Sequence, residues 1–223
     1  MASFFAGEQT KGGVETMDGA LYIVASVFFL LAGFARLFAL IGSRTSIRAQ
    51  EVGNKGVRLA GEGKYQEAIT CFNRAIDLSP NDAMAYYDRG LAYYCLNQYE
   101  RALQDYDDAI RINPNKSDFY YNRGLVYKEL KQAEFAVRDF SQVIRLNSCN
   151  AEACFNRGLA YSVLQQYEEA IQDFNLAIRW EPHHPQLYYN RGLAYRELKQ
   201  DDRAQQDFDR AKELEEGVQK NQE

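Results

Sequence analysis

The sequence predicts an all-α protein: an α-solenoid of five helical hairpins preceded by one transmembrane helix. Two observations lead to this prediction. Residues 49–218 divide without gaps into five blocks of 34 residues, namely 49–82, 83–116, 117–150, 151–184 and 185–218. Repeats of this length are supersecondary units that bury their apolar surface by stacking on one another. Ahead of the blocks, an apolar run from Ala20 to Gly42 contains a single charge, Arg36.

Four block positions carry residues with a clear packing role. Position 8 is always glycine and position 20 always alanine, so we expect the two helices of a hairpin to cross closely there. Position 24 is always aromatic and should fill the space beside the crossing. Position 32 is proline in three blocks, and a proline there ends the second helix. In block order the residues are Gly56, Gly90, Gly124, Gly158 and Gly192; Ala68, Ala102, Ala136, Ala170 and Ala204; Phe72, Tyr106, Phe140, Phe174 and Phe208; and Pro80, Pro114, Ser148, Pro182 and Glu216.

This register resembles the tetratricopeptide repeat (TPR), a family of stacked helix–turn–helix units, over residues 49–218. The resemblance implies a right-handed superhelix whose concave surface is the usual ligand site. Family members that clamp the C-terminal carboxylate of chaperones need lysine at position 5 and asparagine at position 9 of the first repeat. Here those positions hold Gly53 and Val57, so a chaperone-tail receptor is not expected.

The apolar run is predicted to form a transmembrane helix within residues 19–43. The 23 residues from Ala20 to Gly42 extend about 34 Å as a helix, enough to cross a hydrocarbon core of roughly 30 Å. The short N-terminal segment, residues 1–18, has no positively charged start, which argues against a cleaved signal peptide.

Flanking charge predicts the orientation of this helix. Arg36, Arg44 and Arg48 cluster at its C-terminal end, whereas the N-terminal flank is net acidic. The positive-inside bias therefore puts the repeats on the cytoplasmic or an equivalent (stromal) side, with the N-terminus across the membrane. Residues 44–48 are expected to be a linker and residues 219–223 a tail.

The first helix of each block has an apolar face opposite the hairpin core. At 100° per residue, positions 4, 8 and 11 form the core face, and positions 2, 5, 6, 9 and 13 form the opposite one. Positions 5 and 9 on that second face are aromatic or aliphatic. These side chains either pack against neighbouring first helices or form an apolar groove on the concave surface. They are Tyr87, Tyr121, Phe155 and Tyr189 at position 5, and Val57, Leu91, Leu125, Leu159 and Leu193 at position 9.

Position 6 adds an almost complete column of asparagines beside this apolar stripe, with an aspartate in the second repeat: Asn54, Asp88, Asn122, Asn156 and Asn190. An amide both donates and accepts, so it can pair with the backbone of an extended peptide whatever its side chains. The column is similar to the asparagine ladder in the repeat arm of O-linked N-acetylglucosamine transferases, which holds peptides in this way. The alternative is that these amides bond neighbouring helices or water.

Two charged columns are interpreted as structural. Position 7 is arginine in repeats two to five and position 23 is aspartate in the same repeats. An unpaired charge at the edge of the inward face would be costly, so we expect ion pairs within or between repeats. Both columns change in the first repeat, to Lys55 and Cys71. The others are Arg89, Arg123, Arg157 and Arg191, and Asp105, Asp139, Asp173 and Asp207.

The fifth block is predicted to end the stack. In the other four blocks position 17 is mostly tyrosine, position 21 is aliphatic and position 28 is isoleucine. In the fifth block these positions are polar: Asp201, Gln205 and Lys212. A solenoid needs a solvated end face to remain soluble.

Several function classes are excluded by composition and motifs. A net charge of −5 argues against nucleic-acid binding, which needs a basic surface. The segment GEGK at residues 61–64 lacks the upstream glycine and the following serine or threonine of a phosphate-binding loop. The four cysteines are scattered and no pair forms a CxxC: Cys71, Cys95, Cys149 and Cys154. A zinc site would have to combine Cys149 and Cys154 with the only histidines, His183 and His184, and that ligand spacing fits no usual zinc pattern.

We therefore expect no enzyme activity, cofactor, metal or small-molecule substrate. The expected function is that of a membrane-anchored scaffold or adaptor whose groove holds an extended segment of a client protein. Assembly of a membrane complex is one form of this function. The alternative is a stable structural subunit of a larger membrane complex.

Overall fold

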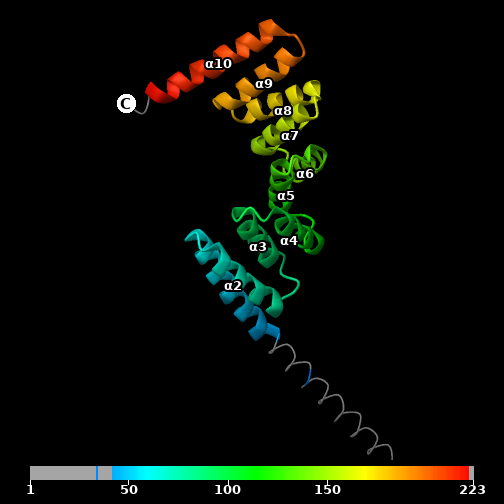
Figure 1. Cartoon of the computed structure of the whole chain (residues 1–223), viewed down its shortest axis with the longest axis vertical. Helices are drawn as coiled ribbons and strands as arrows, with labels where there is room; N and C mark the ends of the chain where they lie inside the picture. The colour runs from blue at the N-terminus through cyan, green and yellow to red at the C-terminus, as the bar shows by residue number, and fades with distance from the viewer. Residues whose placement is uncertain (1–33, 35–41, 221–223) are drawn as a thin grey trace, which may run out of the picture.

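The computed structural model describes residue 34 and residues 42–220, and over this range it is an array of helical hairpins (Figure 1). A first helix over residues 42–61 is followed by α2 (Tyr65–Leu78), α3 (Ala83–Cys95), α4 (Tyr99–Ile112), α5 (Ser117–Glu129), α6 (Ala133–Leu146), α7 (Ala151–Val163), α8 (Tyr167–Trp180), α9 (Pro185–Glu197) and α10 (Asp201–Lys220). No strand occurs among these described residues. The all-α class is confirmed, and helices α3, α5, α7 and α9 begin at the first residue of predicted blocks two to five.

The first helix of the array extends ahead of the first predicted block. Residues 44–48, expected to be a linker, are helical and continuous with the first helix of repeat one. They contain neither proline nor glycine, so nothing in this stretch interrupts a helix. The predicted transmembrane helix, residues 19–43, lies almost entirely outside the described residues. Within the part of the chain that the structure describes, no helix is both long and apolar enough to cross a membrane.

A ring packed on a glycine holds each hairpin together. A Cβ atom built on Gly56 would lie 2.6 Å from the ring of Phe72, and one on Gly158 would lie 2.7 Å from the ring of Phe174. Because real Cβ atoms do not approach a ring this closely, glycine at position 8 is a steric requirement. Repeat two has tyrosine as its ring: Tyr106 is fully buried, and its hydroxyl has no partner among the described residues.

The arginine at position 7 connects its repeat to the preceding one. In repeat four, Arg157 Nε and Nη2 donate to the two carboxylate oxygens of Asp173 at 2.7 and 2.6 Å. Its Nη1 donates to the hydroxyl of Ser141, in the second helix of repeat three, at 3.0 Å. The predicted structural ion pairs are confirmed, and each spans its own hairpin while reaching the previous one. The other pairs are Arg89–Asp105, Arg123–Asp139 and Arg191–Asp207, which reach Asn73, Asp107 and Asn175.

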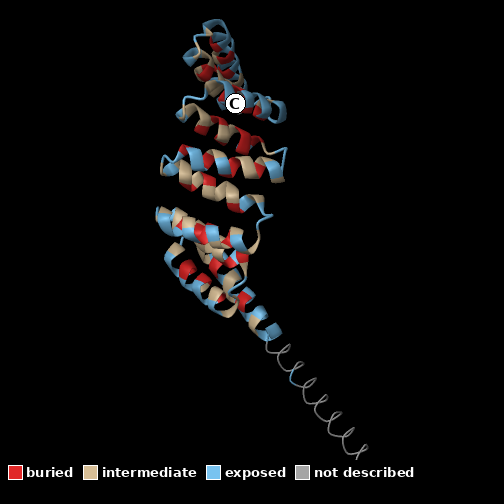
Figure 2. Cartoon of the chain, turned by 90° about the vertical axis from the view of Figure 1, so that its right-hand side faces the viewer, coloured by how far each residue is buried: buried red, intermediate tan, exposed pale blue. Residues whose placement is uncertain are grey.

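Stacking of the hairpins gives the array an inner side. Neighbouring hairpins pack through α2 on α3, α4 on α5, α6 on α7 and α8 on α9. The first helices α3 and α5 also contact each other, as do α7 and α9. Among the second helices α2, α4, α6, α8 and α10, no pair makes as many contacts with each other. The first helices therefore lie on the inner side of the curve. Buried residues recur on every hairpin along the array (Figure 2).

The turn inside each hairpin uses a left-handed residue at position 15. In repeat one this residue is Gly63, with φ of 77°. The other four turns place side-chain-bearing residues there, with φ between 56° and 61°: Asn97, Lys131, Gln165 and Lys199. Because this conformation is sterically unfavourable without glycine, the tight connection between the helices is what maintains it.

The outer face of repeat five is solvated, as predicted. Asp201, Gln205 and Lys212 are exposed on α10, which packs against α9. The residues equivalent to Gln205 in repeats one and four, Ile69 and Ile171, are buried against the next hairpin. The polar substitutions thus lie on the surface that docks a further repeat elsewhere in the array.

Candidate peptide-binding groove

The position-5 aromatic side chains line the inner side of the array, each resting on the position-24 ring of its own repeat. The Tyr87 ring lies 6.0 Å from that of Tyr106 and 5.0 Å from that of Phe119 in the next repeat. Tyr87 therefore packs against a neighbouring first helix while it remains half-buried. The equivalent ring pairs are Tyr121–Phe140, Phe155–Phe174 and Tyr189–Phe208, at 5.8, 6.0 and 5.6 Å.

The position-9 residues continue this surface. Leu91, Leu125, Leu159 and Leu193 are all half-buried. At the two ends of the array, Val57 and Tyr189 are each 50% exposed. Both sequence interpretations therefore describe part of the surface, because these side chains pack on neighbouring helices and still present an apolar strip to solvent.

Two of the position-6 amides are engaged within the protein. Asn122 Nδ2 donates to the hydroxyl of Tyr87 at 3.0 Å, and Asn156 Nδ2 donates to that of Tyr121 at 3.2 Å. Each also donates to the carbonyl four residues earlier in its helix. The amide of one repeat thus fixes the tyrosine of the previous repeat, so these two side chains bond neighbouring helices, as one of the two interpretations proposed.

The remaining members of the column lack this bridge for reasons visible in the sequence. The repeat before Asn190 has Phe155 at position 5, and its ring has no hydroxyl to accept a hydrogen bond. Asn190 therefore donates only to the Gln186 carbonyl, at 2.8 Å. The repeat before Asp88 has Gly53 at position 5, so Asp88 has no ring hydroxyl of a preceding repeat to bind. Asn54, in the first repeat, is exposed. Within the described part of the chain, the polar atoms of these three side chains therefore make no hydrogen bond to a neighbouring repeat.

Burial shifts the titration of two neighbouring groups in repeat two. It raises the pKa of the Tyr87 hydroxyl to about 12, with smaller contributions from Asp118 and Asp88. Burial also raises the pKa of the Asp88 carboxyl to about 6, and Asp82 adds to the shift. The Asp88 carboxyl, the second member of the position-6 column, therefore titrates just below neutral pH.

A cavity of about 350 Å³ opens between α5 and α7, on the inner side of repeats three and four. Four predicted groove residues line it, two from each helix: Tyr121, Leu125, Phe155 and Asn156. The structure brings these four together, whereas the groove residues of repeats one and two lie outside this cavity. Its remaining lining residues are Lys128, Ala151, Glu152, Glu181, His184 and Leu187.

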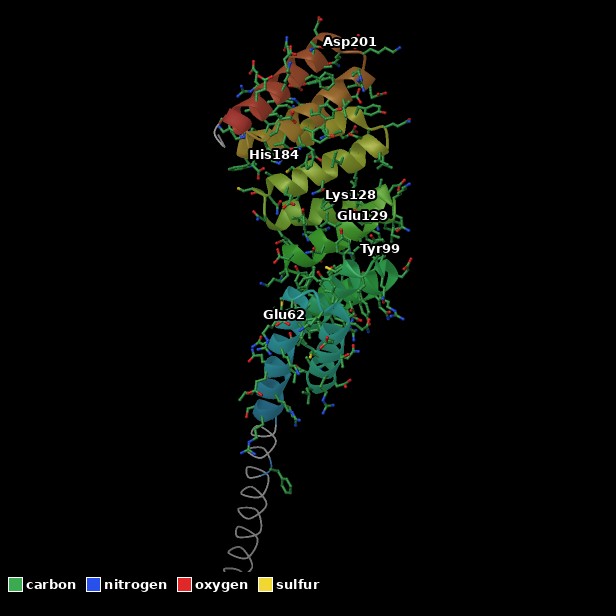
Figure 3. The ribbon with its side chains drawn as sticks, turned by 60° about the vertical axis from the view of Figure 1, so that its left-hand side comes forward. Glu62, Tyr99, Lys128, Glu129, His184 and Asp201 are labelled. Carbon is green, nitrogen blue, oxygen red and sulfur yellow. The ribbon has the colours of Figure 1, made fainter. Side chains whose placement is uncertain are left out.

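Sequence reasoning missed the charged residues of this cavity. Lys128 Nζ donates to Asn156 Oδ1 at 2.8 Å, and the His184 ring lies 6.4 Å from that of Phe155 (Figure 3). Lys128 stands at position 12, which is Ala60, Tyr94, Ser162 and Arg196 in the other repeats. Because no column recurs there, the repeat pattern carried no signal for it.

The residues weighed for metal binding do not meet. Cys71, Cys95, Cys149 and Cys154 are free thiols, and Cys154 is fully buried. Over the described ranges, no cluster of three or more histidine, cysteine or acidic side chains has the arrangement needed to hold a metal ion.

Family models match nearly the whole array. TPR repeat models match residues 58–96 and 92–131, and tetratricopeptide repeat models match residues 117–148, 151–184 and 185–217. The chain belongs to the tetratricopeptide-repeat family. It is therefore a protein-interaction array, built from a repeat family that is typically non-enzymatic.

Solved structures show the same TPR fold. MamA from Desulfovibrio magneticus RS-1 is 25% identical with a TM-score of 0.73, and the match covers 76% of this chain and 96% of that one. YrrB, described as a TPR protein with an unusual peptide-binding site, is 24% identical with a TM-score of 0.68, over 73% of this chain and 84% of that one. No curated protein matches the chain significantly.

The two kinds of amide predict different mutational costs. Asn156→Ala removes the bonds to Tyr121 and Lys128, so it should lower the free energy of unfolding by about 1–3 kcal/mol. Asn190→Ala is the matched control, since it removes only a bond within its own helix, and should cost about 0.5 kcal/mol or less. Urea denaturation of both variants measures this difference. Equal losses would show that the bridge to the preceding repeat carries no stability.

Asp88→Asn restores the amide found at four of the five column positions and should change the pH dependence of folding. With its pKa raised to about 6 in the folded state, Asp88 favours folding when protonated, and this contribution is lost as the pH rises from about 4 to above 6. The variant should therefore match the parent near pH 4 and exceed its stability by about 1–3 kcal/mol at pH 7. Urea denaturation across this range tests it. A stability difference independent of pH would contradict the assignment.

Proposed function

We propose that this protein is a membrane-anchored TPR scaffold or adaptor that holds an extended segment of a client protein in its inner groove. The observation that carries the proposal is the cavity between α5 and α7. There the half-buried aromatic and leucine side chains open into a space of about 350 Å³ with polar groups at its edge. Assembly of a membrane complex is the setting in which we expect this activity.

The polar groups at the cavity suit a peptide backbone. Lys128 uses one N–H on Asn156 and keeps others for a carbonyl or carboxylate of the ligand. Glu152 and Glu181 are exposed and can accept backbone N–H groups. The rings of Tyr121 and Phe155 supply apolar contact area between them. An extended segment presents both donors and acceptors along its length, which matches this arrangement.

The family supports the same class of ligand. YrrB, which has a similar fold, is described as having a peptide-binding site. The inner side of this array differs from a chaperone-tail clamp because repeat one has Gly53 and Val57 at the positions that would hold a carboxylate. We therefore place the ligand at an internal segment of the client, with its anchor in repeats three and four.

The anchor in this proposal is the apolar run from Ala20 to Gly42. The helix that enters repeat one is already helical at residue 42, the first residue of the continuous described range, and in this proposal the membrane helix would continue into the array without a linker. Arg44 and Arg48 are exposed on its first turns, where they can contact lipid headgroups. The repeats would then face the cytoplasm or stroma, with the N-terminus across the membrane.

A second candidate function is that of a stable subunit in a membrane complex. The observation that favours it lies on α8, where Leu176 and Trp180 are one helical turn apart and are 36% and 53% exposed. A permanent partner would cover these side chains, and in that case the array would serve as a structural spacer.

Site-specific photocrosslinking separates the two functions. A photoreactive phenylalanine analogue at Glu152 samples the cavity, one at Trp180 samples the α8 surface, and one at the exposed Glu168 is the control. We expect discrete adducts from position 152, at substoichiometric yield, that Lys128→Glu reduces. Adducts from position 180 alone, at fixed stoichiometry, would identify a stable subunit and contradict client binding in the groove.

Removing residues 1–41 tests the anchor. The full chain should stay in the membrane pellet through an alkaline carbonate wash, because an inserted helix resists extraction. The truncated chain should appear in the supernatant with its helical content intact. Truncated protein that still sediments with membranes would place the attachment in the repeats, and protection of the repeats from protease on the cytoplasmic side would reverse the orientation.

A further inference from the structure

Position 17 is tyrosine in three repeats and serves each time to fill the junction with the next repeat. Tyr65, Tyr99 and Tyr167 start the second helices of repeats one, two and four. Each packs into the apolar cluster that contains the position-10 residue of the following repeat. Those position-10 residues are Ala92, Val126 and Ala194 respectively.

Repeat three has Ala133 at this position, and the residue it faces in repeat four is also small, Ala160. The junction is therefore not filled. A cavity of about 280 Å³ remains there, lined by Lys128, Lys131, Ala133, Ala136, Leu159, Ala160 and Val163. This cavity, the junction pocket, is a vacancy where the sister repeats have a phenol ring.

The junction pocket has a buried floor and an open rim. Ala136 and Ala160 are 0% and 3% exposed, whereas Val163 at the rim is 68% exposed. An apolar cavity of about 150 Å³ is already large enough to bind benzene. A pocket that is larger, apolar and open to solvent can accept one aromatic side chain from outside the molecule.

The rim also specifies the charge around that side chain. Lys128 and Lys131 line the junction pocket, and none of its lining residues is acidic. In repeat two, the Tyr99 hydroxyl donates to the side chain of Asn97, at position 15 (Figure 3 labels Tyr99). Position 15 of repeat three is Lys131, whose ammonium group can instead donate to a phenol oxygen or to a carboxylate beside it.

We propose that the junction pocket is a docking site for a tyrosine side chain of a partner protein, flanked in that partner by acidic residues. The equivalent tyrosines of the other repeats show what the space accommodates, and the exposed Lys131 at the rim selects the surrounding charge, because the Lys128 ammonium group is bound to Asn156. A buried aromatic anchor with a charged rim is the usual composition of a strong interface contact. This site is a different cavity from the one in the inner groove, although Lys128 lines both, and it does not depend on the function proposed for the groove.

Methyl NMR on the full chain in lipid nanodiscs tests the site, with alanine and valine methyl groups labelled with ¹³C. The probe is the capped peptide Asp-Asp-Tyr-Asp-Asp. It should cause saturable shifts at Ala133, Ala160 and Val163. Asp-Asp-Ala-Asp-Asp and Lys-Lys-Tyr-Lys-Lys, which lack the ring or the charge, should bind about tenfold more weakly or not at all.

Two substitutions and one control complete the test. Ala133→Tyr fills the pocket with the ring of the sister repeats, so it should raise the melting temperature and abolish the shifts. Gln132→Tyr adds the same ring at an exposed neighbouring position outside the pocket lining and should leave binding unchanged. Lys131→Glu, also exposed, should weaken binding of the acidic peptide about tenfold without loss of folding.

Four outcomes would overturn the proposal. The first is an absence of saturable shifts with the tyrosine peptide. The second is binding of that peptide by Ala133→Tyr as tight as by the parent. The third is binding of the lysine peptide as tight as that of the acidic one. The fourth is that pocket methyl shifts in the absence of peptide depend on protein concentration, because a second copy of the chain would then be the occupant.

Discussion

The arginine at position 7 is the contact on which the geometry of the array depends. Its guanidinium binds the aspartate of its own hairpin with two N–H groups and the second helix of the preceding repeat with a third. The aspartates are almost fully buried, and breaking a buried pair leaves an uncompensated charge. Each repeat is therefore fixed internally and to its neighbour by one side chain. The first repeat, with Lys55 and Cys71, heads the array and does not use this contact.

Positions with a hard steric or electrostatic requirement made the hairpins predictable. Gly56 is needed because the Phe72 ring occupies the place of its Cβ, and such requirements recur at fixed spacing in the sequence. The helical state of residues 44–48 was not predicted, because helix continuation leaves no such mark. Their composition merely permits a helix, and only the structure shows that the helix entering repeat one includes them.

The sequence predicted which residues share the inner face of the first helices, but not which of them form hydrogen bonds with one another. Periodicity placed Tyr121 and Asn156 on one side of their helices, but whether the amide meets the hydroxyl depends on the rotation between successive repeats. That rotation results from packing along the whole junction, which a column of residues does not encode. Lys128 was missed for a related reason. Its role comes from its neighbours Asn156 and Leu159 in the next repeat, not from a repeated position.

In a repeat protein, each residue can be compared with the residues at the same position of the other repeats. A residue that differs from them therefore shows what the usual side chain contributes. Phe155 lacks the hydroxyl of Tyr121, and the next amide, Asn190, loses its bridge. Ala133 lacks the ring of its sister tyrosines, and a pocket remains. Phe155 lies in repeat four, and Ala133 lies in repeat three at its junction with repeat four. Lys128, also in repeat three, lines both the inner cavity and the junction pocket. The Lys128 ammonium group is bound to Asn156 on the groove side, so its side chain separates the two openings.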